Sequence, residues 1–336
     1  MVSSQKIAVI GGGSWGTALA LVLARKQAPV SLWVHDPELC QRMVDLRENA
    51  TYLPGIALAP SIYPTHSLSA ALEGAALVLT VMPSHTCRTV LGQMRDFLQP
   101  QTMVLSATKG LEDQTLMRMS EVIADVLQPR IAPRIGVLSG PSFAREVAMG
   151  DPTAIVVASA DEELAQAAQV ALSGPTFRVY TSTDVVGVEL AASLKNVIAI
   201  AAGICTGLGL GSNSVAALIS RGLAEMTRLA CACGGQPETL AGLAGLGDLV
   251  LTCTGGLSRN RSVGEALGRG EKLAQILGSM KMVAEGVKTT ASAVVLARRH
   301  HVELPITEQM HRVLFEDRSP REAIRELMER SLKPEW

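Results

Sequence analysis

The chain begins with a short apolar run that leads directly into a glycine-rich turn. Ile7–Ile10 are four apolar residues, Gly11, Gly13 and Gly16 follow in the pattern G-x-G-x-x-G, and Thr17–Arg25 is rich in alanine and leucine. In a strand–turn–helix of this kind the first glycine makes a tight turn, the second lets the backbone approach a pyrophosphate, and the third lets the helix pack on the strand. The N–H groups at the start of the helix attract the anion. This order of elements favours a dinucleotide site over a purely structural glycine turn.

The end of the second expected strand, Val30–Asp36, bears on which dinucleotide is used. NAD-selective sites carry an acidic residue about twenty positions after the glycines, which binds the ribose 2′-hydroxyl. Val34 occupies that region, and the next residue, His35, can meet a 2′-phosphate as a partial cation. Asp36 keeps NAD possible if the strand register differs by one or two residues, and His35 with Asp36 can also simply open a polar turn before Pro37. We therefore expect NADP(H), with NAD(H) also accepted.

Composition indicates a two-domain enzyme of the cytoplasm. A length of 336 residues exceeds one typical domain, and with only 3% aromatic residues the cores must be filled by alanine, leucine and valine. A net charge of −1 argues against a broad basic surface for nucleic acid or anionic membranes. No signal peptide is recognisable, and Val197–Ile204 is the nearest apolar run but too short to span a bilayer. The six cysteines form no CxxC pair and the six histidines show no ligand spacing, so we expect reduced thiols and no metal.

Two halves of the chain follow different patterns. Up to about residue 180 short β-rich runs alternate with helical segments, which predicts a mostly parallel, doubly wound sheet. From Asp184 onward the pattern is helical, and Val185–Ile204 has the composition of a nearly all-buried helix. We expect a dinucleotide-binding α/β domain at 1–182 and an all-α substrate and catalytic domain at 183–336. The strands after the first two are expected at Ala75–Val81, Met103–Ala107, Arg134–Leu138, Ala154–Ala158 and Phe177–Tyr180.

Three of the expected strands end in unusual loops. Ligands of open parallel sheets bind outside the carboxyl ends of the strands. Met82–Ser84 follows one strand at a place where a loop would cover the cofactor, and Ser139–Ala144 pairs a close-approach glycine with a hydroxyl at a new helix start. Lys109, just before Gly110, would place an ammonium over the crevice, although an ordinary solvated lysine is the alternative.

The helical half carries a second group of polar residues. Lys195 lies in a helix otherwise almost free of charge, where an unpaired ammonium is costly, so it is paired or functional, or else it reaches the surface at a helix edge. Asp248 is its natural partner, and Thr252 lies four residues later on the same helical face. Ser258–Asn260 offers a hydroxyl, a guanidinium and an amide at a helix start, which suits a phosphate. For Arg259 an ordinary surface arginine is the alternative.

Taken in order, these motifs closely resemble the bacterial NAD(P)-dependent glycerol-3-phosphate dehydrogenase family. The similarity spans nearly the whole chain, and the combination is far more specific than the glycine pattern alone. The motifs are Gly11–Gly16, Thr108–Gly110, Ser139–Ala144, Leu194–Asn196, Gly245–Asp248, Ser258–Asn260 and Val283–Gly286.

The resemblance implies a Rossmann-like α/β domain followed by an all-α domain. It also implies reversible hydride transfer between NAD(P)H and dihydroxyacetone phosphate, giving sn-glycerol 3-phosphate for phospholipid synthesis, with Lys195 as the acid/base. Beside the turn glycines Gly11, Gly13 and Gly16, the positions matching cofactor contacts are Ser14, Trp15, His35, Lys109, Ala144, Arg259, Val283 and Glu285. The positions matching substrate contacts are Lys109, Gly140, Ser142, Lys195, Asp248, Ser258, Arg259 and Asn260.

Two other functions stay open at this point. A related reductase of another hydroxy acid would share the fold and a helical lysine, but it would not need the Ser258–Asn260 phosphate set. A non-catalytic nucleotide-sensing module would be expected to carry a partner-binding segment, and it would have no use for Lys195. The apolar helical half is compatible with a homodimer, although one sequence shows no interface.

Overall fold

The computed structural model describes residues 6–26, 28–128, 131–280, 284–332 and 334–335. The chain divides into two compact units, Met1–Glu189 and Leu190–Trp336. The division falls inside helix α8 (Val185–Gly207), whereas the boundary expected at 182/183 lies at the end of strand β8. Val283, one of the expected cofactor contacts, lies outside the described residues.

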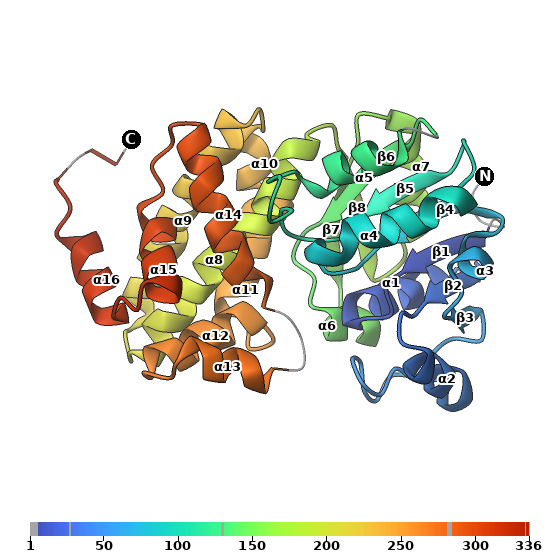
Figure 1. Ribbon diagram of the computed structural model, residues 1–336, viewed down its shortest axis with the longest axis horizontal. Helices are drawn as coiled ribbons and strands as arrows, with labels where there is room; N and C mark the ends of the chain where they lie inside the picture. Colours follow the sequence, from blue (N-terminus) through green and yellow to red (C-terminus); the bar gives the residue numbers. More distant parts are fainter. Residues whose placement is uncertain (1–5, 27, 129–130, 281–283, 333, 336) are drawn as a thin grey trace. The chain divides into compact units, whose positions relative to one another are not determined.

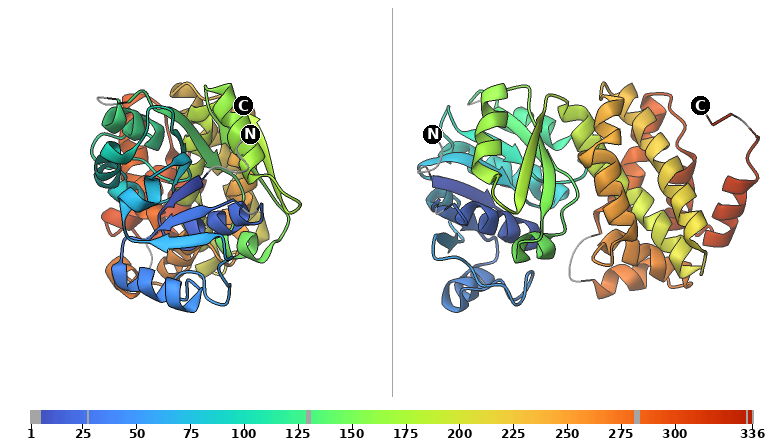
Figure 2. Two further views of the ribbon diagram at one scale, coloured as in Figure 1. Left: turned by 90° about the vertical axis from the view of Figure 1, so that its right-hand side faces the viewer. Right: turned by 180° about the vertical axis from the view of Figure 1, so that it is seen from behind.

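The first unit is built on one sheet of eight strands in the order β3-β2-β1-β4-β5-β6-β7-β8 (Figures 1 and 2). Every neighbouring pair is parallel except β6 and β7, which run antiparallel. The mostly parallel, doubly wound sheet expected from the sequence is confirmed. The strands are β1 (Lys6–Ile10), β2 (Val30–Trp33), β3 (Ile62–Thr65), β4 (Ala75–Thr80), β5 (Met103–Ser106), β6 (Arg134–Ser139), β7 (Thr153–Ala158) and β8 (Phe177–Ser182).

Two details of this sheet differ from expectation. Strand β3 was not expected, because it contains Pro64 and buries only Ile62 completely. Proline is tolerated there because β3 pairs with a single neighbour at the edge of the sheet. Strand β2 ends at Trp33 rather than at Asp36, because Asp36 caps the helix that follows.

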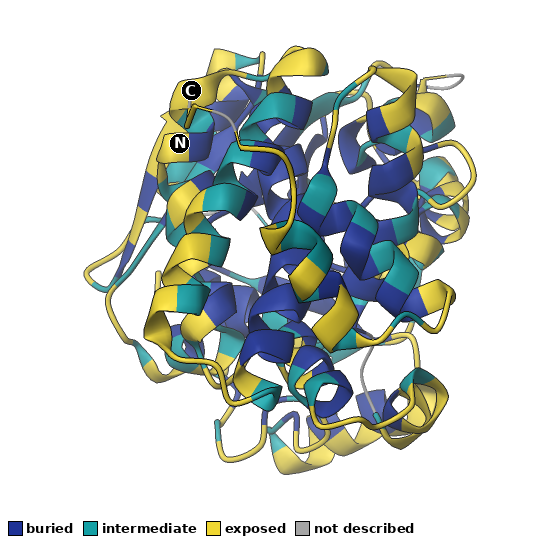
Figure 3. Cartoon of the chain, turned by 90° about the vertical axis from the view of Figure 1, so that its left-hand side faces the viewer, coloured by how far each residue is buried: buried dark blue, intermediate teal, exposed yellow. Residues whose placement is uncertain are grey.

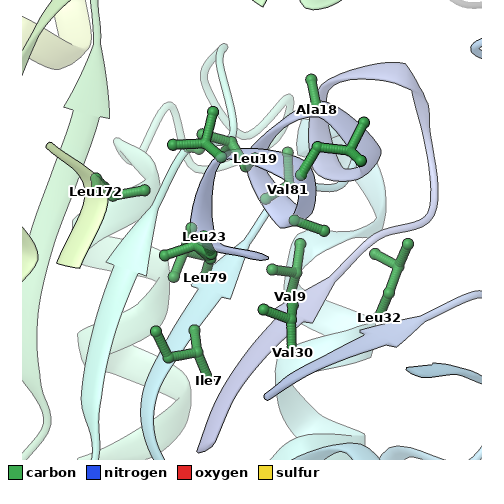
Figure 4. Close-up of a cluster of buried hydrophobic side chains, with 14 of the residues drawn as sticks. Ile7, Val9, Ala18, Leu19, Leu23, Val30, Leu32, Leu79, Val81 and Leu172 are labelled. Carbon is green, nitrogen blue, oxygen red and sulfur yellow. The ribbon is translucent and has the colours of Figure 1, made fainter. Parts of the chain in front are cut away.

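Helices cover both faces of the sheet. Alternate strand residues such as Val9 and Leu79 face the helices α1, α2, α6 and α7, while Ala8 and Val78 face α3, α4 and α5. Figure 4 shows the part of the first cluster that lies between the strands and α1. This burial on both sides explains the near-continuous apolar strands. The helices of this unit are α1 (Ser14–Ala24), α2 (Pro37–Leu46), α3 (Leu68–Leu72), α4 (Ser84–Met94), η1 (Arg95–Phe97), α5 (Met119–Leu127), α6 (Ala144–Met149) and α7 (Glu162–Leu172).

The second unit contains helices throughout its described residues, and their inward sides are buried (Figure 3). The expected all-α architecture is confirmed. After α8 come α9 (Ser212–Ala232), α10 (Pro237–Ala241), the π-helical turn η2 (Leu243–Gly247), α11 (Asp248–Thr254), α12 (Arg259–Gly268), α13 (Leu273–Ser279), α14 (Glu285–Arg299), α15 (Pro305–Phe315) and α16 (Pro320–Met328).

Helix α8 is the apolar core helix of the second half of the chain. By length and composition it is the one helix among the described residues that could cross a membrane, although the sequence was expected to contain no such stretch. The expectation considered only uninterrupted apolar runs, and α8 contains Glu189 and Lys195. Because 89% of its most apolar window is buried inside the protein, its hydrophobicity is accounted for by packing.

Glycines bring α8 and α12 into backbone contact. A Cβ atom at Gly264 would lie 1.9 Å from the carbonyl oxygen of Ile200, and one at Gly203 would lie 2.0 Å from that of Arg261. Such distances exclude any side chain. Gly207 on α8 and Gly268 on α12 make similarly close approaches, so on each helix the contacting glycines are four residues apart. This contact fixes α12 relative to the last turns of α8, which follow the turn that carries Lys195.

Candidate active site

The three glycines of the turn between β1 and α1 have different surroundings. Gly11 has a φ of +130°, and a Cβ there would lie 2.2 Å from the carbonyl oxygen of Val81. A Cβ at Gly16 would lie 1.9 Å from the carbonyl oxygen of Gly11. At Gly13, by contrast, a Cβ would meet no described atom within 4 Å. The protein itself therefore requires the first and third glycines, while the second leaves open space beside the turn.

The start of α1 presents backbone N–H groups that no described side chain caps. Gly13 is the N-cap residue, and among the described residues no side chain caps this end and no acidic residue lies in its first turn. The buried Nε1 atom of Trp15 likewise has no hydrogen-bond partner in the described part of the chain. Buried donors are normally satisfied, and a helix N-terminus favours an anion. Together with the space beside Gly13, these donors fit the pyrophosphate of a dinucleotide.

The residues after β2 bear on the choice between NADP(H) and NAD(H), which the sequence left open. Val34 is buried and packs against Gly12. Asp36 accepts the backbone N–H of Glu38 through Oδ1 at 2.9 Å, so it caps a helix that begins at Pro37, where the sequence suggested only a polar turn. His35 is exposed between them, with its ring centroid 5.6 Å from that of Trp33. Oδ1 of Asp36 is therefore engaged as a helix cap, and the imidazole of His35 is exposed directly before it.

Further predicted residues lie where β5 and β6 end. Lys109 is half-buried after β5. Gly140 follows β6 with a φ of +140°, and a Cβ there would lie 2.9 Å from Cα of Ile155. Ser142 Oγ donates to the carbonyl oxygen of Gly140 at 2.9 Å, and Ala144 is the first residue of α6. The structure therefore places these residues at the same carboxyl edge of the parallel strands as the glycine turn.

In the second unit Lys195 forms a buried ion pair. Its side chain is 5% exposed, and Nζ lies 2.5 Å from Oδ1 of Asp248. Nζ also donates to Oγ1 of Thr252 at 2.8 Å, and Thr252 Oγ1 donates to the carbonyl oxygen of Asp248 at 2.6 Å. The expected partnership with Asp248 is confirmed, and a lysine reaching the surface at a helix edge is excluded. Thr252 was not among the predicted site residues, although its four-residue spacing from Asp248 was the signal for it.

The neighbouring cysteine does not compete with this ammonium. Burial raises the pKa of the Cys253 thiol to about 12, even though the charges of Lys195 and Arg261 oppose the rise. Cys253 therefore remains a neutral thiol near neutral pH. The chemistry available in this cluster is that of an ammonium held in place by a carboxylate and a hydroxyl, which suits a proton donor or an electrostatic stabiliser of a developing oxyanion.

The Ser258–Asn260 segment forms the start of α12. The expected helix start is observed: Ser258 Oγ accepts the backbone N–H of Arg261 at 3.3 Å, and Ser258 is the N-cap residue. Arg259 is exposed in the first turn of α12, while Asn260 is buried. A guanidinium at a helix N-terminus is a favourable combination for a phosphate dianion.

Asn260 also joins α12 to α14. Its Oδ1 atom accepts the backbone N–H of Gly286 at 2.9 Å, next to the predicted cofactor contact Glu285 at the start of α14. A Cβ at Gly286 would lie 2.7 Å from the carbonyl oxygen of Asn196 on α8. The structure therefore brings together Asn260, the start of α14 and the residue that follows Lys195.

A buried carboxylate that sequence reasoning missed anchors the beginning of α8. Glu189 accepts hydrogen bonds from Arg118 at 2.8 Å, from Ser120 N at 2.8 Å and from Ser120 Oγ at 2.6 Å. Burial raises the pKa of Glu189, and the charge and hydrogen bonds of these two partners oppose that rise. These contacts hold the first turns of α8 against the N-terminus of α5. A glutamate in an otherwise apolar helix was the available signal.

The strand order that reverses at the glycine turn, followed by helices with a buried lysine–carboxylate pair, defines a two-unit protein of the Rossmann-like class. Family models narrow this class. Residues 6–165 match the N-terminus, and residues 184–325 the C-terminus, of NAD-dependent glycerol-3-phosphate dehydrogenase. The chain belongs to the NAD-dependent glycerol-3-phosphate dehydrogenase family, as its motifs predicted.

Similar proteins cover the chain from end to end. A glycerol-3-phosphate dehydrogenase (NAD(P)+) of Koribacter versatilis is 59% identical over 328 residues, which are 97% of both chains. One of Geobacter sulfurreducens is 57% identical over 332 residues, 99% of both. The crystal structure of glycerol-3-phosphate dehydrogenase from Coxiella burnetii has a TM-score of 0.94 at 44% identity and covers 98% of this chain and 100% of its own. A ketopantoate reductase from Ralstonia eutropha, 18% identical with a TM-score of 0.60, shares the fold alone.

Proposed function

We propose that this chain is an NAD(P)-dependent oxidoreductase that interconverts dihydroxyacetone phosphate and sn-glycerol 3-phosphate. The observation that carries the proposal is the buried ammonium of Lys195, held by Asp248 and Thr252 in a helical unit that follows a dinucleotide-type sheet. The names of the relatives at 57–59% identity support the same reaction. The buried Lys195 argues against a non-catalytic nucleotide-sensing module, because taking an ion pair out of water is costly.

In this proposal Lys195 handles the proton. When bound, the nicotinamide supplies hydride to the ketone carbon, or accepts it in the reverse direction. Negative charge then grows on the substrate oxygen, and the Lys195 ammonium stabilises it and donates the proton, a contribution of about 10²–10⁴-fold. In the oxidation direction the same nitrogen accepts the proton. Asp248 and Thr252 hold Nζ in position throughout.

The substrate phosphate would be held by the start of α12. Ser258 caps that helix, so the guanidinium of Arg259 and the amide of Asn260 stand at its positive end. Arg259 would also reach the cofactor. At the sheet edge, we assign Lys109, Gly140 and Ser142 to the rest of the substrate; the half-buried position of Lys109 just after the carboxyl end of β5 supports this.

The cofactor would lie along the carboxyl edge of the sheet, in the 1–182 domain, while the 183–336 domain supplies Lys195. Gly11, Gly13, Ser14, Trp15 and Gly16 would hold the pyrophosphate. We assign the 2′-phosphate of NADP(H) to His35, because Asp36 is engaged as a helix cap and Val34 is apolar. NAD(H) should also be accepted. We assign the remaining cofactor contacts to Lys109, Ala144, Arg259, Val283 and Glu285.

The cellular role follows from the product. sn-Glycerol 3-phosphate is the backbone of phospholipids, so we propose a place in their synthesis for a cytoplasmic enzyme. We also propose a homodimer, which sedimentation at several protein concentrations would test.

The direct test is an assay that follows the absorbance of the reduced nicotinamide. Dihydroxyacetone phosphate should be reduced with NADPH and with NADH, whereas unphosphorylated dihydroxyacetone and 2-keto acids should be poor substrates. Comparable turnover of a 2-keto acid would favour the related hydroxy-acid reductase instead. No consumption of either cofactor with any ketone would contradict the proposal.

A further inference from the structure

The fully buried side chain of Asn49 forms a hydrogen bond with the glycine turn. The side chain of Asn49 is 0% exposed. Its Nδ2 atom donates to the carbonyl oxygen of Gly12 at 2.9 Å and to Oγ1 of Thr17 at 2.8 Å, and its Oδ1 atom accepts the backbone N–H of Tyr52 at 3.2 Å. One side chain therefore connects the turn, helix α1 and the segment that follows α2.

The bond to Gly12 has a consequence for the next peptide group. In a trans peptide the carbonyl and the N–H of the following residue point in opposite directions across one plane. Because Asn49 draws the carbonyl of Gly12 toward itself, the N–H of Gly13 is turned away from Asn49. A Cβ at Gly13 would meet no described atom within 4 Å, so the backbone at this residue has open space beside it for the approach of a ligand.

The segment that carries Asn49 is itself well fixed. The carbonyl of Asn49 accepts the N–H of Leu53 at 2.8 Å, and that of Arg47 accepts the N–H of Leu58 at 2.7 Å. Glu48 Oε1 accepts the N–H of Gly55 at 2.8 Å. Asn49 thus lies on a loop that is fixed by its own hydrogen bonds. It can therefore restrict the conformation of the glycine turn.

We infer that Asn49 is a positioning residue for the cofactor, which orients the Gly13 N–H toward the pyrophosphate by holding the carbonyl of Gly12. The inference rests on the proposed dinucleotide-dependent function, and it assigns to Asn49 a part in cofactor affinity without contact with the cofactor. The role requires an amide, because Nδ2 donates two hydrogen bonds while Oδ1 accepts one.

The test is the nearly isosteric substitution Asn49→Asp, compared with Asn49→Ala. A carboxylate still accepts the N–H of Tyr52, but it has no proton to donate to Gly12. Both variants should raise the Kd of NADPH by about tenfold or more, as expected for loss of a buried hydrogen bond together with misorientation of the peptide. The kcat at saturating NADPH and the KM for dihydroxyacetone phosphate should each stay within about twofold of wild type, because Asn49 acts only on the cofactor turn.

Asn213→Ala, at an exposed position at the start of α9, is the matched control and should leave the Kd unchanged. If Asn49→Asp binds NADPH like the wild type, Asn49 merely caps its own loop and the inference is wrong. If neither NADPH nor NADH binds to the wild type, the proposed function itself is wrong, whatever the variants show.

A measurement on the unchanged protein covers the case in which the variants do not fold. Amide exchange at Gly13 should be fast without cofactor and slowed by NADPH. Protection of that amide in the free protein would contradict the inference.

Discussion

Gly12 and Val34 are in direct contact: a Cβ at Gly12 would lie 2.8 Å from Cγ2 of Val34. The first residue after β2 therefore packs on the cofactor turn, at the place where NAD-selective sites carry an acid. Because of this contact, a substitution at position 34 should change cofactor binding while Lys195 stays as it is.

Val34→Asp should shift the preference toward NADH. A carboxylate there repels a 2′-phosphate and can accept a hydrogen bond from a 2′-hydroxyl, so kcat/KM for NADPH should fall more than that for NADH. His35→Ala should lower kcat/KM for NADPH alone. Steady-state kinetics with both cofactors measure the ratio. A wild type that strongly prefers NADH, combined with no effect of His35→Ala on NADPH, would contradict the assignment of His35.

Arg259→Ala should raise the KM for dihydroxyacetone phosphate. Loss of a charge-assisted contact with the phosphate should cost about 1.5–3 kcal/mol, and cofactor binding should weaken as well because the residue serves both ligands. Initial rates with each ligand varied in turn measure both effects. Arg221→Ala on α9 is a control for the loss of an arginine. Unchanged KM values for both ligands would show that Arg259 is an ordinary surface residue.

Glu225 should make the stability of the helical unit depend on pH. This buried carboxylate accepts N–H groups of Ile306 at 2.6 Å and Thr307 at 3.2 Å, at the start of α15. Burial raises its pKa from 4.5 to about 7, although these hydrogen bonds and the charge of Arg228 oppose the rise. Because the folded pKa is above the unfolded one, folding takes up a proton in this range. The contribution to the free energy of unfolding is complete below pH 4.5 and is lost as the pH rises through about 7.

Glu225→Gln should therefore flatten the pH profile. The wild type should lose on the order of 3 kcal/mol from this group between about pH 4.5 and pH 7, whereas glutamine does not titrate. Urea denaturation of both proteins at several pH values measures the difference. Parallel profiles for the two proteins would contradict the raised pKa.

Gly264→Ala should destabilise the contact between α8 and α12. The new methyl group would lie 1.9 Å from the carbonyl oxygen of Ile200, so the helices must move apart, at a cost of about 1–3 kcal/mol. Gly278 in α13 is a matched control, because a Cβ there meets no described atom within 4 Å. Gly278→Ala should be neutral or stabilising by up to about 1 kcal/mol. Equal thermal midpoints for the two variants would mean that the helix contact tolerates a side chain.

The parts of the fold that local sequence patterns determine could be predicted. The strand, the glycines and helix α1 follow one another within a few residues, and the helical pairing of Asp248 with Thr252 depends on a four-residue spacing. Lys195 and Asp248 are far apart in the chain, but an ammonium and a carboxylate in apolar surroundings each need a partner. Their pairing could therefore be inferred from charge alone.

Residues whose role depends on distant backbone could not be predicted in this way. Asn49 acts on the carbonyl of Gly12, and Glu225 acts on the N–H groups at the start of α15; neither partner is marked by a side-chain type. Strand β3 was missed because Pro64 is compatible with a strand only at an edge, which the sheet order decides. The same holds for the contact of Glu189 with Ser120, in which a backbone N–H is one of the donors.

The assignment of Lys195 as the acid/base is tested most directly by the kcat of Lys195→Ala. Truncation removes the proton donor and the charge that faces the forming oxyanion, so kcat should fall by orders of magnitude while the Kd of NADPH, measured separately, stays close to wild type. Lys195→Arg should not restore activity, because a guanidinium hardly deprotonates near neutral pH. A kcat of Lys195→Ala within about threefold of wild type would contradict the account and make Lys109 the next candidate.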